Sequence, residues 1–209
     1  MKKYLDKFKS NIRINKNLFV FLLVIIIIGI LSGAIFSLIL DGDDKSLVSN
    51  YISNFFNSVK DGKFDYDTAI INTLVFTSLF GIIIWLLGIS VIGFFIIIFL
   101  LFLKSFILGF SVGTILGNFG LKGVLISLIY IFPHQVINLL IFMLLSAYGL
   151  IISFKIMRCF CGKKVLDFKN IINRYIKVLV ISVIILVITS YYEVYLMPKV
   201  LKIGLLLLK

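Results

Sequence analysis

The residues that could do chemistry in this chain lie far from its ends, inside strongly apolar sequence. Lys104 stands near the middle of one apolar run, and the next run contains His134, Gln135 and Asn138. If the two runs form an antiparallel helical hairpin, all four side chains come to a similar depth in the membrane. A lysine at mid-membrane costs at least ~2.5–3.5 kcal/mol on insertion scales unless it has a partner or water. We therefore predict an intramembrane polar node in which the other three side chains pair with the Lys104 ammonium.

The same residues make a poor catalytic or metal-binding site. The apolar runs contain one carboxylate, Glu193, which lies near the end of its run. One histidine and one lysine without a nearby acid form neither an efficient proton relay nor a metal site. We therefore predict no catalytic, cofactor-binding or metal-binding residues and no enzymatic activity. A transport pathway through the node remains an alternative.

Small residues recur at a spacing of four in two of the apolar runs. This spacing places them on one face of a helix, and in membranes such faces let two helix backbones approach closely. We predict that they form seams between helices, and self-association of two copies through the second set is an alternative. The predicted helix-packing residues are Gly29, Gly33, Ser105, Gly109, Gly113 and Gly117.

The elements that must position these residues are membrane spans. Of the 209 residues, 61% are hydrophobic, against about 45–50% in soluble domains. Runs of about 20 apolar residues, each long enough to cross ~30 Å of hydrocarbon, recur along the chain. We predict an all-α integral membrane protein with about five transmembrane helices, kinked or broken around Gly88–Gly93 and Pro133. The predicted spans are 18–40, 69–90, 91–117, 121–154 and 176–198.

The fourth run is too long for a straight crossing, which leaves two interpretations open. One is a single tilted helix that is kinked at Pro133, where the missing N–H breaks the backbone hydrogen-bond pattern. The other is a half-helix over 121–132 followed by a full span that starts at Pro133.

The formal charge of +12 is concentrated in a basic arm over 1–17 and a basic loop over 155–175. Basic residues beside spans mark the cytosolic side, so we expect a multi-pass plasma-membrane protein with a cytosolic N-terminus and an extracytoplasmic tail over 199–209. Both blocks also favour contact with anionic membrane lipids. Nucleic acid is not an expected partner, because no soluble fold offers a basic face interleaved with aromatics.

The loop over 41–68 is the acidic one, and its charge places it outside the cell. Within it, residues 46–60 show the spacing of an amphipathic helix with a broad aromatic face. This face could rest on the outer leaflet, pack on the spans below or bind a partner protein. The residues that would form a docking surface are Leu47, Tyr51, Ile52, Phe55, Phe56 and Val59.

Several segments, taken in order, resemble one known family. They are Leu47–Lys63, Trp85–Gly93, Phe102–Gly113, Leu121–Gly123 and Phe132–Gln135. Their order and spacing resemble the stage II sporulation protein M (SpoIIM) family over nearly the whole chain. Wider relatives often carry Pro-His-Gly followed by an acid, whereas this chain has Gln135 in place of the glycine and Asn138 near the place of the acid.

The resemblance implies a non-enzymatic membrane scaffold on the mother-cell side of the sporulation septum. Such proteins hold two peptidoglycan-degrading partners, SpoIIP and SpoIID, in one complex, and they are required for septal thinning and engulfment of the forespore. The implied partners here are therefore SpoIIP- and SpoIID-like hydrolases. The alternative function is a small permease or transport subunit that uses Lys104 and His134.

Overall fold

The computed structural model describes residues 16–160 and 168–207, and every regular element in these residues is helical. Seven α-helices and one π-helical turn, η1, follow one another along the described chain. Their bounds are α2 (Lys16–Ile39), α3 (Gly42–Lys60), α4 (Tyr66–Leu87), α5 (Gly93–Tyr130), α6 (Phe132–Phe160), α7 (Phe168–Tyr191), η1 (Tyr192–Leu196) and α8 (Met197–Leu207).

Five helical segments are long and apolar enough to cross a membrane, which confirms the predicted all-α membrane fold with five spans. At a rise of 1.5 Å per residue, the shortest of them is about 33 Å long, enough for ~30 Å of hydrocarbon. The five segments are Lys16–Ile39, Tyr66–Leu87, Gly93–Gly120, Phe132–Cys159 and Asn170–Lys202.

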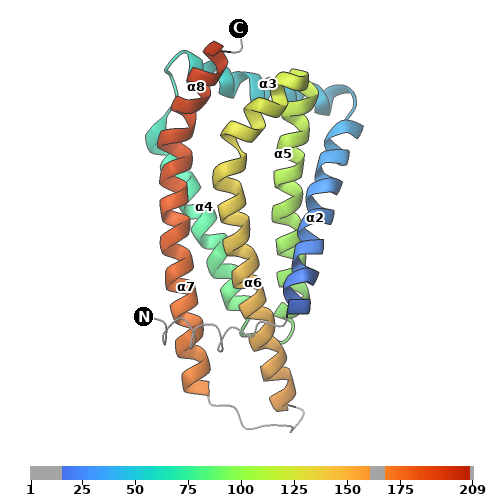
Figure 1. Cartoon of the computed structure of the whole chain (residues 1–209), viewed down its shortest axis with the longest axis vertical. Helices are drawn as coiled ribbons and strands as arrows, with labels where there is room; N and C mark the ends of the chain where they lie inside the picture. Colours follow the sequence, from blue (N-terminus) through green and yellow to red (C-terminus); the bar gives the residue numbers. More distant parts are fainter. Residues whose placement is uncertain (1–15, 161–167, 208–209) are drawn as a thin grey trace.

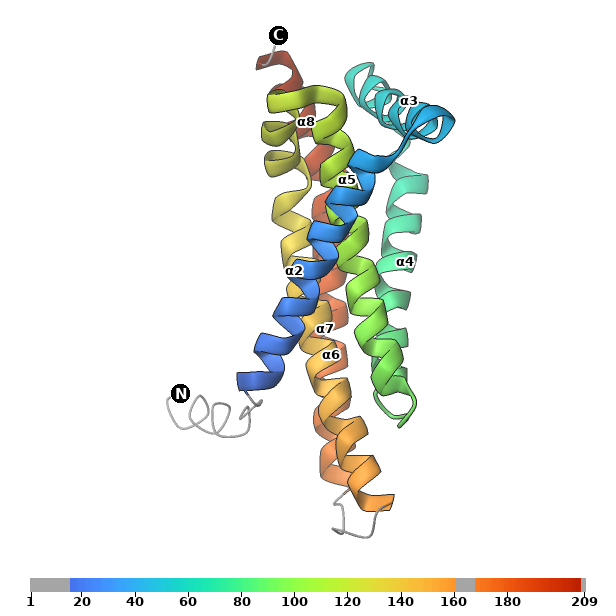
Figure 2. The same cartoon turned by 90° about the vertical axis from the view of Figure 1, so that its right-hand side faces the viewer.

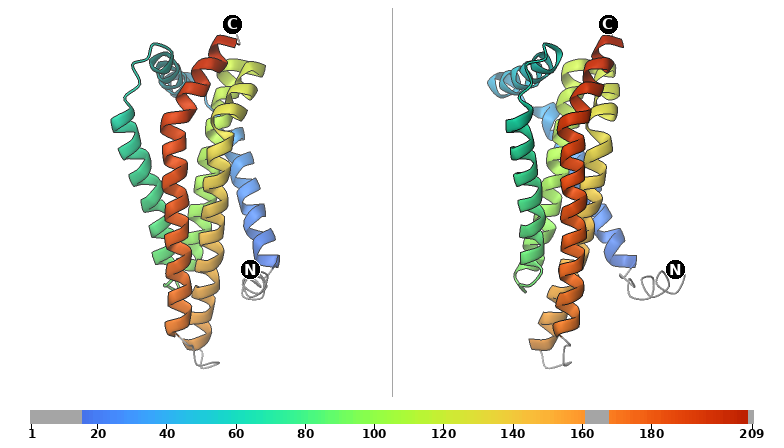
Figure 3. Two further views of the ribbon diagram at one scale, coloured as in Figure 1. Left: turned by 60° about the vertical axis from the view of Figure 1, so that its left-hand side comes forward. Right: turned by 90° about the vertical axis from the view of Figure 1, so that its left-hand side faces the viewer.

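The spans stand side by side in a bundle, and α3 lies across one end of it (Figure 1). We call this the α3 end. The opposite end is here called the basic end, because Lys155, Arg158 and Arg174 are exposed there. α2 crosses α5 obliquely (Figure 2), and α4 and α2 occupy opposite sides of the bundle (Figure 3). At the basic end, α6 and α7 extend beyond the turn between α4 and α5 (Figure 1).

Gly120 reverses the chain at the α3 end. Its φ of 56° and ψ of −137° interrupt α5, so that residues 93–119 run toward the α3 end and residues 121–130 run back. Glycine adopts such a positive φ without steric cost. Pro133 then lies in the first turn of α6, where its missing N–H breaks no helical hydrogen bond. The chain thus has a half-helix followed by a full span, separated at Ile131 rather than kinked at Pro133.

At the basic end, the turn predicted over Gly88–Gly93 joins α4 to α5. Beside it, Trp85 and Tyr175 tie α4 to α7 through two reciprocal hydrogen bonds. The Trp85 Nε1–H donates to the Tyr175 carbonyl at 3.3 Å, and the Tyr175 hydroxyl donates to the Trp85 carbonyl at 2.8 Å. Their rings stack with centroids 5.1 Å apart. Gly88 lies against the Tyr175 hydroxyl, so a larger residue would not fit there.

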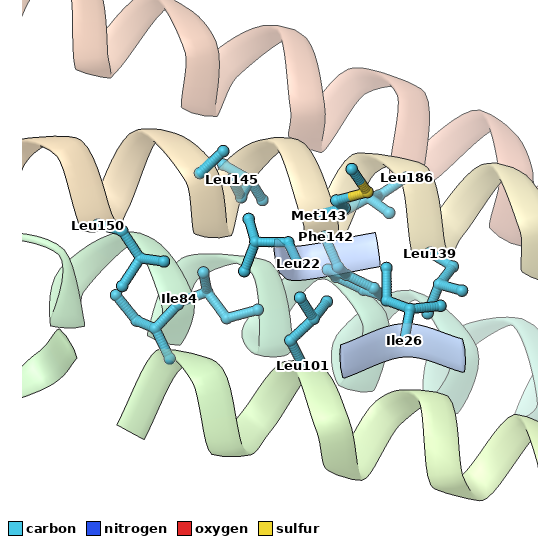
Figure 4. Close-up of a cluster of buried hydrophobic side chains, with 12 residues drawn as sticks. Leu22, Ile26, Ile84, Leu101, Leu139, Phe142, Met143, Leu145, Leu150 and Leu186 are labelled. Atoms are coloured by element: carbon cyan, nitrogen blue, oxygen red, sulfur yellow. The ribbon is translucent and has the colours of Figure 1, made fainter. Parts of the chain in front are cut away.

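The main core lies along α6. In the most apolar 18-residue stretch of the α6 span 56% of the residues are buried, against 17–22% in the corresponding stretches of the other spans, so α6 is the central helix. All five spans contribute side chains to this core (Figure 4). One fully buried residue from each is Leu22, Ile84, Leu101, Leu145 and Leu186.

Two predicted segments differ from the structure. The basic loop expected over 155–175 is helical at both ends, because α6 continues to Phe160 and α7 begins at Phe168. Long basic side chains can extend from a helix end to the membrane surface, so their presence does not require a loop. The tail expected over 199–209 is likewise helical as far as Leu207. Of the basic arm over 1–17, all but the last two residues lie outside the described part of the chain.

Candidate functional site

The two predicted seams face each other, and they bring α2 and α5 into backbone contact. A Cβ added to Gly29 would lie 2.7 Å from the Ser105 Cβ, far closer than carbon atoms normally approach. A Cβ added to Gly33 would collide with the carbonyl oxygen of Phe106. In a membrane, where van der Waals packing drives helix association, this close approach specifies the pair.

The α5 side of the seam repeats the pattern. A Cβ on Gly109 would collide with the backbone of Ile30, and one on Gly113 would collide with the Ser37 hydroxyl. α2 therefore occupies the face that sequence reasoning also offered to a second copy of the chain. Gly117 is different, because nothing lies within 4 Å of the position of its Cβ. The ladder thus contacts α2 as far as Gly113.

Lys104 is half-buried, and its ammonium lies between two aromatic rings. The Nζ atom is 5.6 Å from the ring centroid of Phe80 and 5.6 Å from that of Phe142. Ring faces attract a cation, most strongly where water is scarce. The predicted direct pairing of Lys104 with His134, Gln135 and Asn138 is therefore corrected. Its ammonium contacts these two rings, and the Glu193 carboxylate attracts it from beyond ion-pair distance.

His134 is only 2% exposed and faces an acid from η1. Its Nε2 atom lies 3.6 Å from Oε1 of Glu193, which is within ion-pair distance but beyond hydrogen-bond length. The Tyr130 ring meets the imidazole edge-on at a centroid distance of 6.2 Å. The Nδ1 atom of His134 is buried without a hydrogen-bond partner among the described residues. The imidazole is thus held by a carboxylate and an aromatic ring.

Asn138 lies one turn below His134 on α6 and is also 2% exposed. Its Oδ1 atom accepts a short hydrogen bond from the hydroxyl of Thr189 on α7. Gln135 is half-buried. The structure therefore joins His134 and Asn138 to α7 and η1 rather than to α5. We call His134, Asn138, Thr189 and Glu193 the α6–α7 polar cluster.

The sequence analysis placed Glu193 near the end of its span and did not assign it to the node, because that span was predicted to end at Pro198, and it did not single out Thr189. In the structure the helix continues through Pro198, the second residue of α8, to Leu207. Glu193 thus lies 14 residues before the helix end, and His134 lies 14 residues after Gly120. The 3.6 Å contact between the two side chains shows that they lie at the same depth. A proline removes the donor for a preceding carbonyl. The π-helical turn Tyr192–Leu196, which ends two residues before Pro198, accommodates this and carries Glu193.

The α6–α7 polar cluster can join helices and balance charge. It places a carboxylate near the imidazole of α6 and the ammonium of α5, three groups that would each be costly alone in hydrocarbon. In residues 16–160 and 168–207, no group of three or more His, Cys, Asp or Glu side chains is arranged to hold a metal ion.

At the α3 end, a second apolar cluster attaches α3 to the bundle. Phe56 and Val59 of α3 are 6% and 4% exposed and pack with residues of α5 and α8 and with Ile131, which lies between α5 and α6. The Phe56 and Phe119 rings lie 5.1 Å apart, and the Ser49 hydroxyl donates to Oδ1 of Asn118 at 2.8 Å. Phe56 and Val59 are therefore not available to a partner, which corrects their place in the predicted docking surface.

The other predicted docking residues divide into two groups. Ile52 and Phe55 are half-buried against the same cluster. Leu47 and Tyr51 are 66% and 79% exposed. They lie one helical turn apart, so they share a face of α3 that points away from the bundle.

The model of one protein family, SpoIIM, described as stage II sporulation protein M, matches residues 19–198. The chain belongs to this family. It is therefore a sporulation-related, multi-pass membrane protein. The matched residues include α3, the α2–α5 seam, the α6–α7 polar cluster and most or all of each of the five spans. No curated protein and no solved structure gives a significant match.

Proposed function

We propose that this protein is a non-enzymatic scaffold of the sporulation septum that holds SpoIIP- and SpoIID-like peptidoglycan-degrading partners outside the membrane. It would act on the mother-cell side, for septal thinning and forespore engulfment. The observation that carries the proposal is the position of α3, which lies across one end of the bundle and exposes Leu47 and Tyr51 (Figure 2).

The attachment of α3 supports a binding role. Its inner face is fixed by Phe56 and Val59, and the Phe55 ring lies 5.7 Å from that of Tyr130. A partner that binds the outer face then meets a preorganised surface, so little conformational entropy is lost on binding. Aromatic side chains such as Tyr51 are common binding anchors at protein interfaces.

Charge adds selectivity to this surface. Asp41, Asp43 and Asp44 are exposed at the start of α3, next to Leu47. Charged groups at the rim of an interface mainly affect association rate and partner choice. A partner with an apolar centre and a basic edge fits this arrangement.

The test is co-purification of the hydrolases with the full-length protein from sporulating cells. The double variant Leu47→Asp/Tyr51→Asp should lose the hydrolases but remain in the membrane, because both side chains are exposed. The control is Asn50→Asp/Asn54→Asp, which adds the same charge with the same spacing at exposed polar positions of α3. Retention of the hydrolases by the first variant, or equal loss from both, contradicts the proposal.

A second candidate function is a small permease, and the α6–α7 polar cluster is the observation that favours it. A buried imidazole 3.6 Å from a carboxylate that also attracts the Lys104 ammonium is the kind of polar group that lines a pathway for a charged solute. A cysteine in place of Lys104 separates the two functions. A permease requires that this cysteine react with a water-soluble thiol reagent from one side, whereas a packed scaffold leaves it protected.

A further inference from the structure

Two cavities flank α6 at the basic end of the bundle. The first, of about 290 Å³, lies between α6 and α7 and is lined by Tyr148, Lys155 and Arg174 among others. The second, of about 280 Å³, lies between α6 and the start of α2 and includes Arg158. Lys155 borders both cavities. Three basic side chains are thus grouped around two adjoining hollows at the end of a membrane span.

The basic side chains at these cavities have no acidic partner in the described chain. Lys155, Arg158 and Arg174 are exposed, and no carboxylate of residues 16–160 or 168–207 lies within 4 Å of their charged atoms. Tyr148 also lines the first cavity, and its hydroxyl, a hydrogen-bond donor, interacts electrostatically with Arg174. The cavity therefore offers two cations and a donor to an anion.

We propose that the cavity between α6 and α7 binds the phosphate of an anionic phospholipid, held by Lys155 and Arg174. Guanidinium and ammonium groups are the usual phosphate-binding groups of proteins. In the second cavity, on the other side of α6, Arg158 could bind another phosphate. A lipid with two phosphates would therefore place one phosphate in each cavity.

The walls of the cavity favour a lipid over free phosphate. Ile151, Ile152 and Ile171 line it together with the basic groups. It adjoins a smaller hollow lined by Ile89 and Ile172, whose exposed lining is wholly apolar. Acyl chains can follow this apolar surface, while inorganic phosphate gains nothing from it. Basic pockets between membrane helices are a common form of anionic-lipid site.

The experiment measures lipid retained by the purified full chain in detergent, by native mass spectrometry during titration with phosphatidylglycerol, cardiolipin or phosphatidylcholine. The test variant is Lys155→Gln/Arg174→Gln. The control is Lys16→Gln/Lys177→Gln, which removes two exposed charges at the same end without lining either cavity. Thermal unfolding confirms that both variants are folded.

We expect the wild-type protein to prefer the anionic lipids and the test variant to bind them about thirtyfold more weakly, since two basic side chains at an anionic membrane surface are lost. The control should bind like the wild type. Equal weakening in both variants would mean that only general surface charge attracts lipid, and it would overturn the proposal. Full displacement of bound lipid by excess inorganic phosphate would assign the cavity to free phosphate and overturn the lipid assignment.

Discussion

The substitution Gly109→Ala tests whether α2 and α5 are held by backbone contact. An added Cβ would overlap the carbonyl oxygen of Ile30 and lie 2.7 Å from its C and Cα atoms. Ordinary carbon contacts are about 3.5–4.0 Å, so the two helices would have to separate by about 1 Å. Backbone atoms cannot rotate away as a flexible side chain can. The whole seam would therefore loosen.

Overpacking of this kind costs about 1–3 kcal/mol. Replacement of a helical glycine by alanine returns about 0.5–1 kcal/mol through helix propensity. Gly117→Ala provides the matched control, because it lies on the same ladder with nothing within 4 Å of its Cβ position. Gly117→Ala should therefore show only the stabilisation of about 0.5–1 kcal/mol from helix propensity. The two variants should therefore differ in free energy of unfolding by about 1–3 kcal/mol.

The assay is reversible unfolding in mixed detergent micelles, followed by helical circular dichroism and by the fluorescence of Trp85, the one tryptophan of the chain. We expect Gly109→Ala to unfold at a lower denaturant fraction than the wild type, and Gly117→Ala at an equal or higher fraction. If both variants are equally stable, the close α2–α5 contact does not hold the fold together, and the reasoning about the seam is wrong.

Three further predictions concern single side chains. Lys104→Met should leave the free energy of unfolding unchanged or raise it. Removal of a charge from the membrane saves ~2.5–3.5 kcal/mol, which exceeds the lost cation–π contribution of about 0.5–2 kcal/mol. A large loss of stability on unfolding in detergent would contradict this. Tyr175→Phe should cost about 1 kcal/mol and shift the Trp85 emission, since it removes the hydroxyl that donates to the Trp85 carbonyl; unchanged emission and stability would argue against the α4–α7 tie. Hydrogen bonds from the side chain and backbone of Thr68 lower the pKa of Asp65 at the start of α4. Its contribution to stability is therefore present above the unfolded pKa and is lost as the pH falls through the folded pKa. The wild type should consequently lose more stability than Asp65→Asn between roughly pH 5 and pH 2, and parallel pH profiles would contradict this.

The number of spans and the small-residue faces of α2 and α5 could be predicted because each depends on local pattern, whereas the pairing of these two faces could not. Apolar length defines a span, and a spacing of four defines a helix face, so Gly29 and Gly109 could be assigned to packing from sequence. The half-helix after Gly120 was foreseen as one of two alternatives. Its exact break depends on a positive φ, which the sequence indicates only through the presence of a glycine.

The partners of the buried polar groups could not be predicted from the hairpin alone. Depth along one hairpin placed Lys104 beside His134, but the rotation of each helix about its axis decides which neighbour a side chain meets. That rotation is set by tertiary packing, which directs His134 toward Glu193 of η1 and Lys104 toward Phe80 and Phe142. The contact between Glu193 and His134 was not predicted, because the last span was expected to end at Pro198, whereas the helix continues through it.

The same limit applied to α3. The helical spacing of its apolar residues was clear from the sequence, and this spacing indicated a broad apolar face. Periodicity does not say which part of that face the bundle covers. The structure buries Phe56 and Val59 and exposes Leu47 and Tyr51, so the surface available to a partner is narrower than the pattern implied.

The central claim, that the exposed face of α3 binds peptidoglycan-degrading partners, is tested most directly by site-specific photo-crosslinking in sporulating cells. A photoreactive amino acid at position 51 should crosslink to a SpoIIP- or SpoIID-like hydrolase, whereas the same probe at the buried position 56 should not. Crosslinks from position 51 to lipid or to other copies of this chain alone, with the hydrolases present in the same membrane, would contradict the account.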